Sequence, residues 1–250
     1  MKNQKIGVII QARMGSSRFP GKVLMNLDEN ERVLDLLIKR LKLSKYVNLI
    51  IIAITPNNID LQLVNAAKSH NVSYFIGSEE NVLKRYYDAA KKFKLDIIIR
   101  VTSDCPFVDP KILDDMIDFY IKNEYDYIRN IEESTNFPRG FDIEIFSFTI
   151  LQKVFFLANT KQQKEHVTYF IYTHPEIFKI QNFNIKNLKK FENLRLTIDE
   201  KDDLTMCREV YKRLKKSGKG IDFTIFDVIK IIEKEPDLME INKLIEQRKS

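Results

Sequence analysis

The first half of the chain alternates short apolar runs with amphipathic segments. Four runs rich in β-branched residues lie at Ile6–Ile10, Leu49–Ile54, Val72–Ile76 and Ile97–Thr102. They are apolar on both faces, which is typical of parallel strands covered by helices on each side. The segments between them have helical spacing, and Pro110 opens a further helix. This β-α-β-α order predicts a doubly wound α/β sheet.

The helical segments are recognised by apolar residues three and four positions apart, which form one face of a helix. The four sets are Leu34, Leu37, Ile38 and Leu41; Leu61, Val64 and Ala67; Val82, Tyr86, Ala89 and Phe93; and Ile112, Met116 and Phe119.

The pattern is less regular after Tyr125. We expect strands at 125–130, 141–146, 178–183 and 194–198, and helices at about 149–157, 165–172, 204–214, 225–232 and 238–245. No internal repeat and no linker rich in Gly or Pro divides the chain. The sequence therefore predicts one domain over residues 1–250, with an arm at about 130–190.

Composition narrows the class of protein. The 250 residues are 44% hydrophobic and 30% charged, as in globular proteins. No apolar run approaches a membrane span, and the first one stops at Gln11, which is too short for a secretory signal. Two cysteines, Cys105 and Cys207, provide neither a disulfide framework nor a zinc site. We expect a cytoplasmic protein without membrane contact.

The net charge of +6 leaves the type of ligand open. A basic balance suits nucleic acid or an anionic small substrate. Here the cations are interleaved with acids along most of the chain, which favours a solvated basic surface over a nucleic-acid face.

The loop after the first strand is the first candidate site, because ligands of α/β sheets bind at the carboxyl ends of strands. It runs from Gln11 to Lys22 and carries two glycines and three cations, Arg13, Arg18 and Lys22. Exposed backbone amides and cationic side chains are what a polyphosphate needs, so the loop predicts phosphate binding. Its spacing fits neither a Walker A loop nor a dinucleotide-binding motif.

Two aspartates follow apolar runs, Asp104 after 97–102 and Asp199 after 194–198. They could meet at one sheet edge and hold magnesium, or each could cap the next helix. Asp142 and Glu144 alternate along an expected strand and so share a face, which is either a site or the wet side of the sheet. His166 is either a ligand contact or a structural histidine. Arg85 is either a nucleotide contact or a solvated helix residue.

Ordered motifs along the chain resemble those of the sugar cytidylyltransferases, in the branch named after spore-coat polysaccharide biosynthesis protein F. Residues 9–22, IIQARMGSSRFPGK, carry the strongest likeness. The others are GSEENVLKRYY at 77–87, RVTSDCP at 100–106, FDIEIF at 141–146, EHVT at 165–168 and LRLTID at 194–199. The chain departs from relatives at Ser103, where they usually have Gly, and at Tyr169, where they commonly have Pro.

The resemblance implies a magnesium-dependent enzyme that transfers CMP from CTP to a sugar or sugar acid and releases pyrophosphate. It implies a nucleotide-diphosphosugar transferase (GT-A-like) fold with a mixed sheet, and a homodimer formed through the arm. The implied catalytic residues are Arg13, Lys22 and Asp104, and the implied metal ligands are Asp104 and Asp199. The implied nucleotide-binding residues are Gln11, Ala12, Arg13, Gly15, Ser16, Ser17, Arg18, Lys22, Arg85 and Thr102. The implied acceptor-binding residues are Asp142, Glu144 and His166.

Three other functions remain open at this point. A glycosyltransferase of related fold would use an acidic metal pair, which Asp142-Ile143-Glu144 imitates. A non-catalytic nucleotide-binding protein would share the loop without turnover. An RNA-binding protein would show a steep salt dependence of binding.

Overall fold

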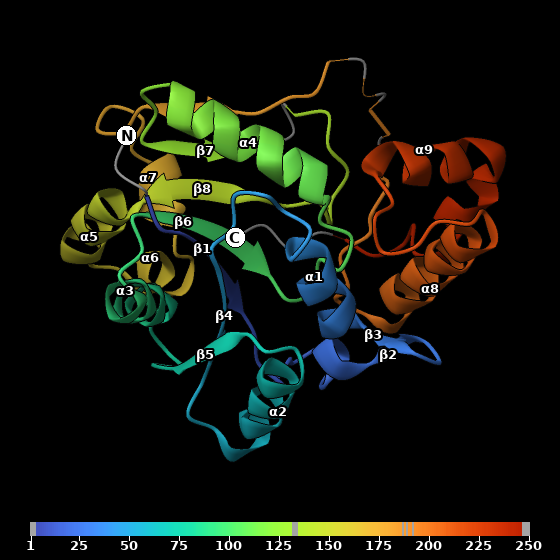
Figure 1. Cartoon of the computed structure of the whole chain (residues 1–250), viewed down its shortest axis with the longest axis horizontal. Coiled ribbons are helices and arrows are strands. Elements are labelled where there is room, and N and C mark those ends of the chain that lie inside the picture. The colour runs from blue at the N-terminus through green and yellow to red at the C-terminus, as the bar shows by residue number, and fades with distance from the viewer. Residues whose placement is uncertain (1–3, 132–134, 187, 189, 192, 247–250) are drawn as a thin grey trace.

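A computed structural model describes residues 4–131, 135–186, 188, 190–191 and 193–246. Its centre is a seven-stranded sheet in the order β5-β4-β1-β6-β8-β7-β9 (Figure 1). The strands are β1 (Ile6–Gln11), β4 (Leu49–Ile54), β5 (Ser73–Ile76), β6 (Ile97–Thr102), β7 (Tyr127–Arg129), β8 (Glu144–Ser147) and β9 (Ile180–Asn182).

The sheet is mixed: β1, β4 and β6 run parallel to one another, and the strand direction reverses between β6 and β8. β1 pairs in parallel with β4 and β6, and Ile9 lies between Ile51 and Arg100 in register. β8 runs antiparallel to β6 and β7, and β9 is again parallel to β7. The four strands predicted in the first half are confirmed. At the sheet edge, however, β5 leaves Tyr74 and Ile76 exposed, so it is not covered on both faces as we expected.

Helices cover both faces of the sheet and define two hydrophobic clusters. One cluster includes buried residues of α1 (Val33–Leu41), α2 (Gln62–Ser69), α4 (Pro110–Lys122), α8 (Lys201–Lys216) and α9 (Ile225–Lys234). The other includes residues of α3 (Val82–Phe93), α5 (Phe148–Leu157) and α7 (Tyr169–Tyr172). The short α6 (Lys161–Glu165) contacts α3 and buries no residue. Within the described part of the chain, no helix is long and apolar enough to cross a membrane.

Local sequence explains where the helices begin and which face they bury. The four apolar positions predicted for the first helix, Leu34 to Leu41, are all fully buried in α1. Asp109 caps α4 by accepting the Lys111 and Ile112 amides, and Pro110 follows as the first helical residue. Leu61 is the exception among the predicted inner positions, because it precedes α2 and is exposed.

Several segments differ from the sequence prediction. Residues 194–198 form no strand; they make one isolated bridge, Arg195 with Arg139, although they are buried. The expected helix at 165–172 is divided into α6 and α7, with His166 at the C-cap of α6. The expected strand at 141–146 begins only at Glu144. The expected helix at 238–245 is a 3-10 helix, η3 (Pro236–Ile241).

Four short elements in the described part of the chain were not predicted. A hairpin of β2 (Asn26–Asp28) and β3 (Glu31–Arg32) precedes α1. Two 3-10 helices, η1 (Lys22–Leu24) and η2 (Asn58–Leu61), follow β1 and β4.

Candidate active site

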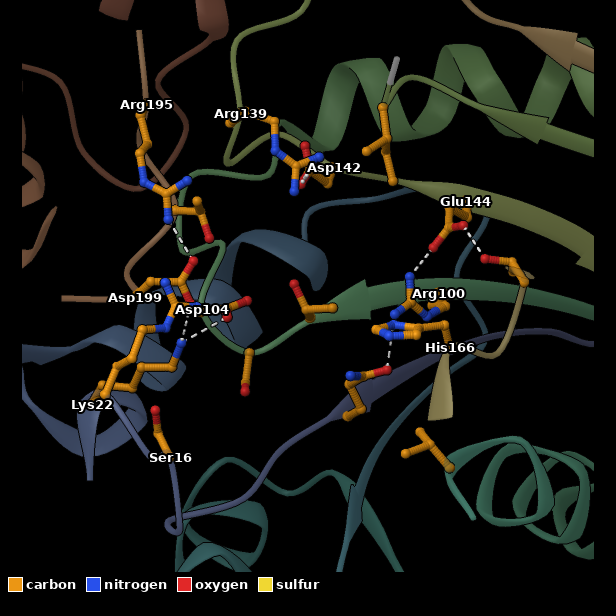
Figure 2. A pocket seen from close by; sticks show the side chains of 18 of the residues that line it. Ser16, Lys22, Arg100, Asp104, Arg139, Asp142, Glu144, His166, Arg195 and Asp199 are labelled. Atoms are coloured by element: carbon orange, nitrogen blue, oxygen red, sulfur yellow. Dashed lines mark hydrogen bonds and ion pairs between the residues drawn. The ribbon is translucent and has the colours of Figure 1, made fainter. Parts of the chain in front are cut away.

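A large cleft opens at the carboxyl ends of β1 and β6. Its volume is about 2690 Å³, and it reaches from the loop after β1 to the segment between α6 and α7 (Figure 2). All the predicted site residues except Gly15 line this cleft; they are Gln11, Ala12, Arg13, Ser16, Ser17, Arg18, Lys22, Arg85, Thr102, Asp104, Asp142, Glu144, His166 and Asp199. The structure therefore brings into one cavity residues that are up to 188 positions apart, from Gln11 to Asp199.

The loop after β1 is fixed by backbone hydrogen bonds that converge on Met14. The Met14 amide donates to Asp60 Oδ1 at 2.6 Å, and the Met14 carbonyl accepts from the Gly21 amide at 2.9 Å. Asp60 is buried and also accepts from the Thr55 hydroxyl. Gly21 has a φ of 74°, a conformation that glycine adopts readily, and it turns the chain into η1, which begins at Lys22.

Lys22 joins the two aspartates that the sequence singled out. Its Nζ lies 2.8 Å from Asp104 Oδ2 and 2.9 Å from Asp199 Oδ1, and it donates to the Ile198 carbonyl at 2.6 Å. Burial acts to lower the pKa of the Lys22 ammonium, but the two carboxylates outweigh it and the pKa is raised. Burial acts to raise the pKa of Asp104, and Lys22 holds that pKa below its usual range.

Asp199 has two further cationic neighbours. Arg18 Nη2 lies 2.7 Å from its Oδ1, and Arg195 Nη2 lies 2.5 Å from its Oδ2. Burial alone would raise the pKa of Asp199, yet Lys22, Arg18 and Arg195 together lower it. Asp199 is therefore a carboxylate shared among three cations.

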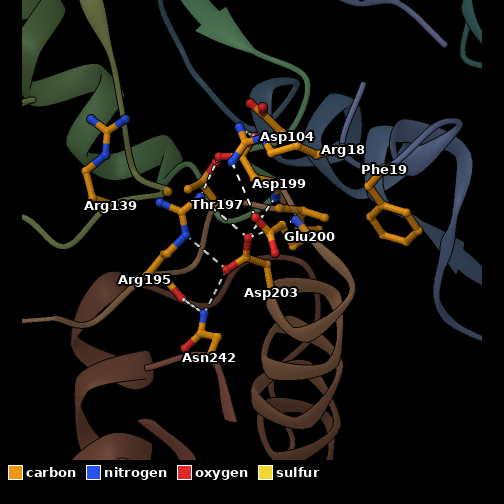
Figure 3. A network of polar contacts seen from close by, with 12 residues as sticks. Arg18, Phe19, Asp104, Arg139, Arg195, Thr197, Asp199, Glu200, Asp203 and Asn242 are labelled. Carbon is orange, nitrogen blue, oxygen red and sulfur yellow. Dashed lines mark hydrogen bonds and ion pairs between the residues drawn. The ribbon is translucent and has the colours of Figure 1, made fainter. Parts of the chain in front are cut away.

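Behind Asp199 lies a network that sequence analysis missed (Figure 3). Asp203, which is fully buried, accepts the Asp199 amide at 2.9 Å and Arg195 Nε at 3.0 Å. Asn242, at the end of η3, donates to Asp203 Oδ1 at 2.9 Å and to the Arg195 carbonyl at 3.0 Å. Arg195 and Asp203 lie four residues before and after Asp199, and this spacing was the one feature of the sequence that could have indicated the network. Nothing in the sequence around Asn242 indicated its place in the network.

Gly140 joins this network to the opposite wall of the cleft. Its φ is 105°, and a Cβ built there would lie 2.4 Å from the carbonyl carbon of Leu196. The Leu196 amide donates to the Arg139 carbonyl at 2.8 Å. Arg139 also forms an ion pair with Asp142, and burial raises the pKa of Asp142 in spite of that partner.

Glu144 forms the far end of the cleft with a closed set of partners. It pairs with Arg100 and accepts from the Tyr127 hydroxyl and from Thr168 Oγ1, the last at 2.6 Å. Burial would raise the pKa of Glu144, but Arg100 and the hydrogen bonds lower it. Asp142 and Glu144 are both buried, so they are not the wet face of a sheet, and they bind different arginines rather than forming one metal pair.

A model of the family described as "Cytidylyltransferase" matches residues 7–248. The chain belongs to the cytidylyltransferase family. It is a nucleotidyltransferase, which sets aside the non-catalytic alternative.

Relatives of this cytidylyltransferase span almost its whole length. The spore coat polysaccharide biosynthesis protein SpsF of Bacillus subtilis is 35% identical over 237 residues, 92% of this chain and 94% of that protein. A solved cytidylyltransferase from Leptospira borgpetersenii is 34% identical, covers 98% of this chain and 100% of its own, and has a TM-score of 0.88. A CMP:2-keto-3-deoxy-manno-octonic acid synthetase complexed with CTP shares the fold, with 16% identity, a TM-score of 0.65 and coverage of 84% and 99%. The fold is nucleotide-diphosphosugar transferase-like, as the resemblance implied.

Arg85 and Cys105 are both buried in this cytidylyltransferase. Arg85, on α3, is buried and donates from Nη1 to the Ser78 carbonyl at 2.7 Å, so it is not the solvated helix residue that was the alternative. Cys105 is also buried, and burial raises the pKa of its thiol, as expected of a packed cysteine rather than a nucleophile.

The aspartate pair is suited to a divalent ion but incomplete without further ligands. Among the residues that the structure describes, no group of three His, Cys, Asp or Glu side chains could hold a metal. Magnesium is commonly bound by one or two carboxylates together with substrate phosphates and water. Lys22 already places a cation between Asp104 and Asp199, which indicates that this pair fits a positive ion.

Proposed function

We propose that this cytidylyltransferase transfers CMP from CTP to a hydroxyl of a sugar or sugar acid and releases pyrophosphate. One observation carries the proposal: the cation-bearing loop after β1 faces the Asp104–Asp199 pair within a single cleft. Phosphoryl-type transfer depends mainly on positioning and on neutralising charge, and these residues provide both.

The loop is the proposed binding site for the triphosphate. Arg13, Arg18 and Lys22 neutralise the β- and γ-phosphates, and the amides of residues 15–17 donate to their oxygens. Gly15 serves through its backbone, which agrees with open space around its Cα. The nucleoside lies along the remaining predicted residues, Gln11, Ala12, Arg85 and Thr102.

Asp104 and Asp199 are the proposed ligands of magnesium. The bound ion would polarise the α-phosphate and stabilise the charge that develops on it. Arg195 and Asp203 hold the Asp199 carboxylate and amide in place, so the chain supplies a preorganised ligand.

The acceptor sugar is assigned to the end of the cleft with Asp142, Glu144 and His166. His166 is half-buried, and burial lowers its pKa, which favours the neutral imidazole, a form that can both donate a hydrogen bond to a hydroxyl and accept one from it. Glu144 is fully engaged with protein donors, so its contribution is to shape this wall through Arg100 and Thr168.

We propose that the product enters surface polysaccharide synthesis, by analogy with the relative from Bacillus subtilis. We also propose a homodimer formed through the arm at 130–190. On α5, Phe156 is 69% exposed and Leu157 is 41% exposed, and this apolar surface supports the interface. Light scattering that gives the monomer mass at micromolar concentration would contradict the dimer.

The enzymatic proposal is tested by pyrophosphate release with magnesium. CTP is offered beside ATP, GTP and UTP, together with a panel of neutral and acidic sugars, and CMP-sugar adducts are detected by mass spectrometry. We expect turnover with CTP and at least one sugar. If the protein binds no CTP in the presence of magnesium, the proposed function is wrong.

A further inference from the structure

The Lys22 ammonium is held as proteins hold a metal ion. Three oxygens surround Nζ within 2.9 Å, two from carboxylates and one from the Ile198 carbonyl. The side chain is only 10% exposed, and all three oxygens come from segments far from Lys22 in sequence. A divalent cation seeks the same donors, so it competes with Lys22 for Asp104 and Asp199.

The same pair is too small to bind a divalent ion tightly by itself. No third acidic, histidine or cysteine ligand joins the two aspartates within the described residues. Arg18 and Arg195 add positive charge beside Asp199, which further opposes a second cation. The missing ligands and the missing negative charge can both be supplied by phosphate oxygens.

We propose that the cleft works by exchange of cations. In the nucleotide-free enzyme Lys22 occupies the divalent-ion position and holds Asp104 and Asp199 together. When CTP binds, Lys22 turns its flexible stem toward the phosphates, and the divalent ion takes the carboxylates that it leaves. Metal and nucleotide therefore bind with positive coupling, and each binds weakly alone. This inference rests on the proposed function and adds how that site is regulated.

The first experiment contains no nucleotide. Manganese binding is measured by electron paramagnetic resonance for the wild type and for Lys22→Met. We expect about tenfold tighter binding in the variant, the size of a typical coupling. Lys39→Met is the matched control, because Lys39 also pairs with a carboxylate, Glu31 at 2.7 Å, but lies outside the cleft lining. Equal manganese affinity in wild type and Lys22→Met overturns the proposal.

A second experiment substitutes Asp104. Loss of an ordinary ligand-binding residue weakens binding, whereas this substitution is expected to strengthen the binding of CTP. In EDTA, Asp104→Asn frees Lys22 from one partner, so CTP is expected to bind several-fold tighter, about fivefold or more. Adding Lys22→Met should cancel this gain, since the gain acts through the ammonium. Asp142→Asn removes a carboxylate of the same cleft that pairs with Arg139 instead, and it controls for general repulsion.

The outcomes separate this inference from the function on which it rests. A gain of equal size with and without Lys22, or no gain at all, overturns cation exchange while leaving CTP binding intact. If wild type in magnesium binds no CTP, the proposed function fails, and the manganese experiment still decides whether Lys22 occupies the ion position. If Lys22→Met does not fold, Asp104→Asn alone decides: unchanged or weaker CTP binding in EDTA overturns the exchange.

Discussion

At the Lys22 end of the cleft two carboxylates share several cations, whereas at the Glu144 end one carboxylate is enclosed by a fixed set of donors. Asp199 contacts Lys22, Arg18 and Arg195, so the proposed departure of Lys22 toward a phosphate leaves Asp199 paired with Arg195, which Asp203 holds in place. Glu144 is buried with Arg100, Tyr127 and Thr168, and removal of any one leaves a polar group without its partner. Figure 2 shows the two groups on opposite sides of the cleft. Similar ion pairs therefore serve exchange at one end of the cleft and rigidity at the other.

The largest effect is expected from breaking the rigid end. Glu144→Gln leaves Arg100 without a counter-charge in a mostly buried position, and loss of one partner of a buried pair costs about 3–5 kcal/mol of unfolding free energy. Urea denaturation measures it, with the exposed cleft residue Glu165→Gln as the control. A loss below about 1 kcal/mol, as for a surface pair, would show that both ends are alike.

At the Lys22 end of the cleft, substitutions are expected to change the rate of pyrophosphate release. Lys22→Ala or Asp104→Ala is expected to lower pyrophosphate release by roughly two or three powers of ten, because each removes a preorganised charge from the transition state. Circular dichroism checks that the fold is retained, and Lys39→Ala controls for loss of a paired lysine. Undiminished turnover in either cleft variant would argue against a role for that residue.

Acid provides a smaller and more specific test. Lys22 keeps the pKa values of Asp104 and Asp199 low, so the stability they contribute is complete above the ordinary aspartate pKa of about 3.9 and is lost as the pH falls through their folded pKa values. In Lys22→Met this contribution is reduced. The difference in melting temperature between wild type and variant in EDTA should therefore shrink by roughly 2–4 °C from pH 7 to pH 3. A constant difference would indicate that Lys22 stabilises by packing.

The smallest effect is expected behind the exchanging end. Asn242→Ala removes one donor to Asp203 and so loosens the support of Asp199. Losing a group that directly holds a metal ligand typically costs about 10–100-fold in metal affinity. Asn242 acts one contact further away, so the magnesium concentration for half-maximal rate should rise by less than about tenfold, with little change at saturating magnesium. Asn65→Ala, on the exposed side of α2, is the control. A lower rate at saturating magnesium with an unchanged requirement would assign Asn242 to the chemistry itself.

Much of the fold could be predicted because its signals are local. The runs that became β1, β4 and β6 are each six residues long and mostly apolar, and buried central strands produce that pattern. Residues 194–198 alternate apolar and polar positions as a strand can, but for a different reason. Leu194, Leu196 and Ile198 are buried, but the amides of Leu196 and Ile198 donate to the carbonyls of Arg139 and Asp104, in loops rather than in a neighbouring strand.

Some features of the site could also be predicted from the sequence, and others could not. Asp104 and Asp199 could be anticipated to meet because each follows an apolar run that leads to one edge of the fold. Their union through Lys22 could not, since it depends on the φ of Gly21 and on where η1 begins. Asn242 was beyond sequence reasoning, because it reaches Asp203 from a 3-10 segment that carries no motif.

The close approach at Gly140 has a consequence for how acceptor choice can vary. With a single hydrogen facing Leu196, Gly140 leaves no space between the proposed acceptor wall and the segment that leads to Asp199. A bulkier residue there would shift the aspartate as well as the sugar. Substitutions that change the preferred acceptor are therefore expected away from the contact of Gly140 with Leu196. At such positions the side chains around the proposed acceptor site can change while Asp199 keeps its position.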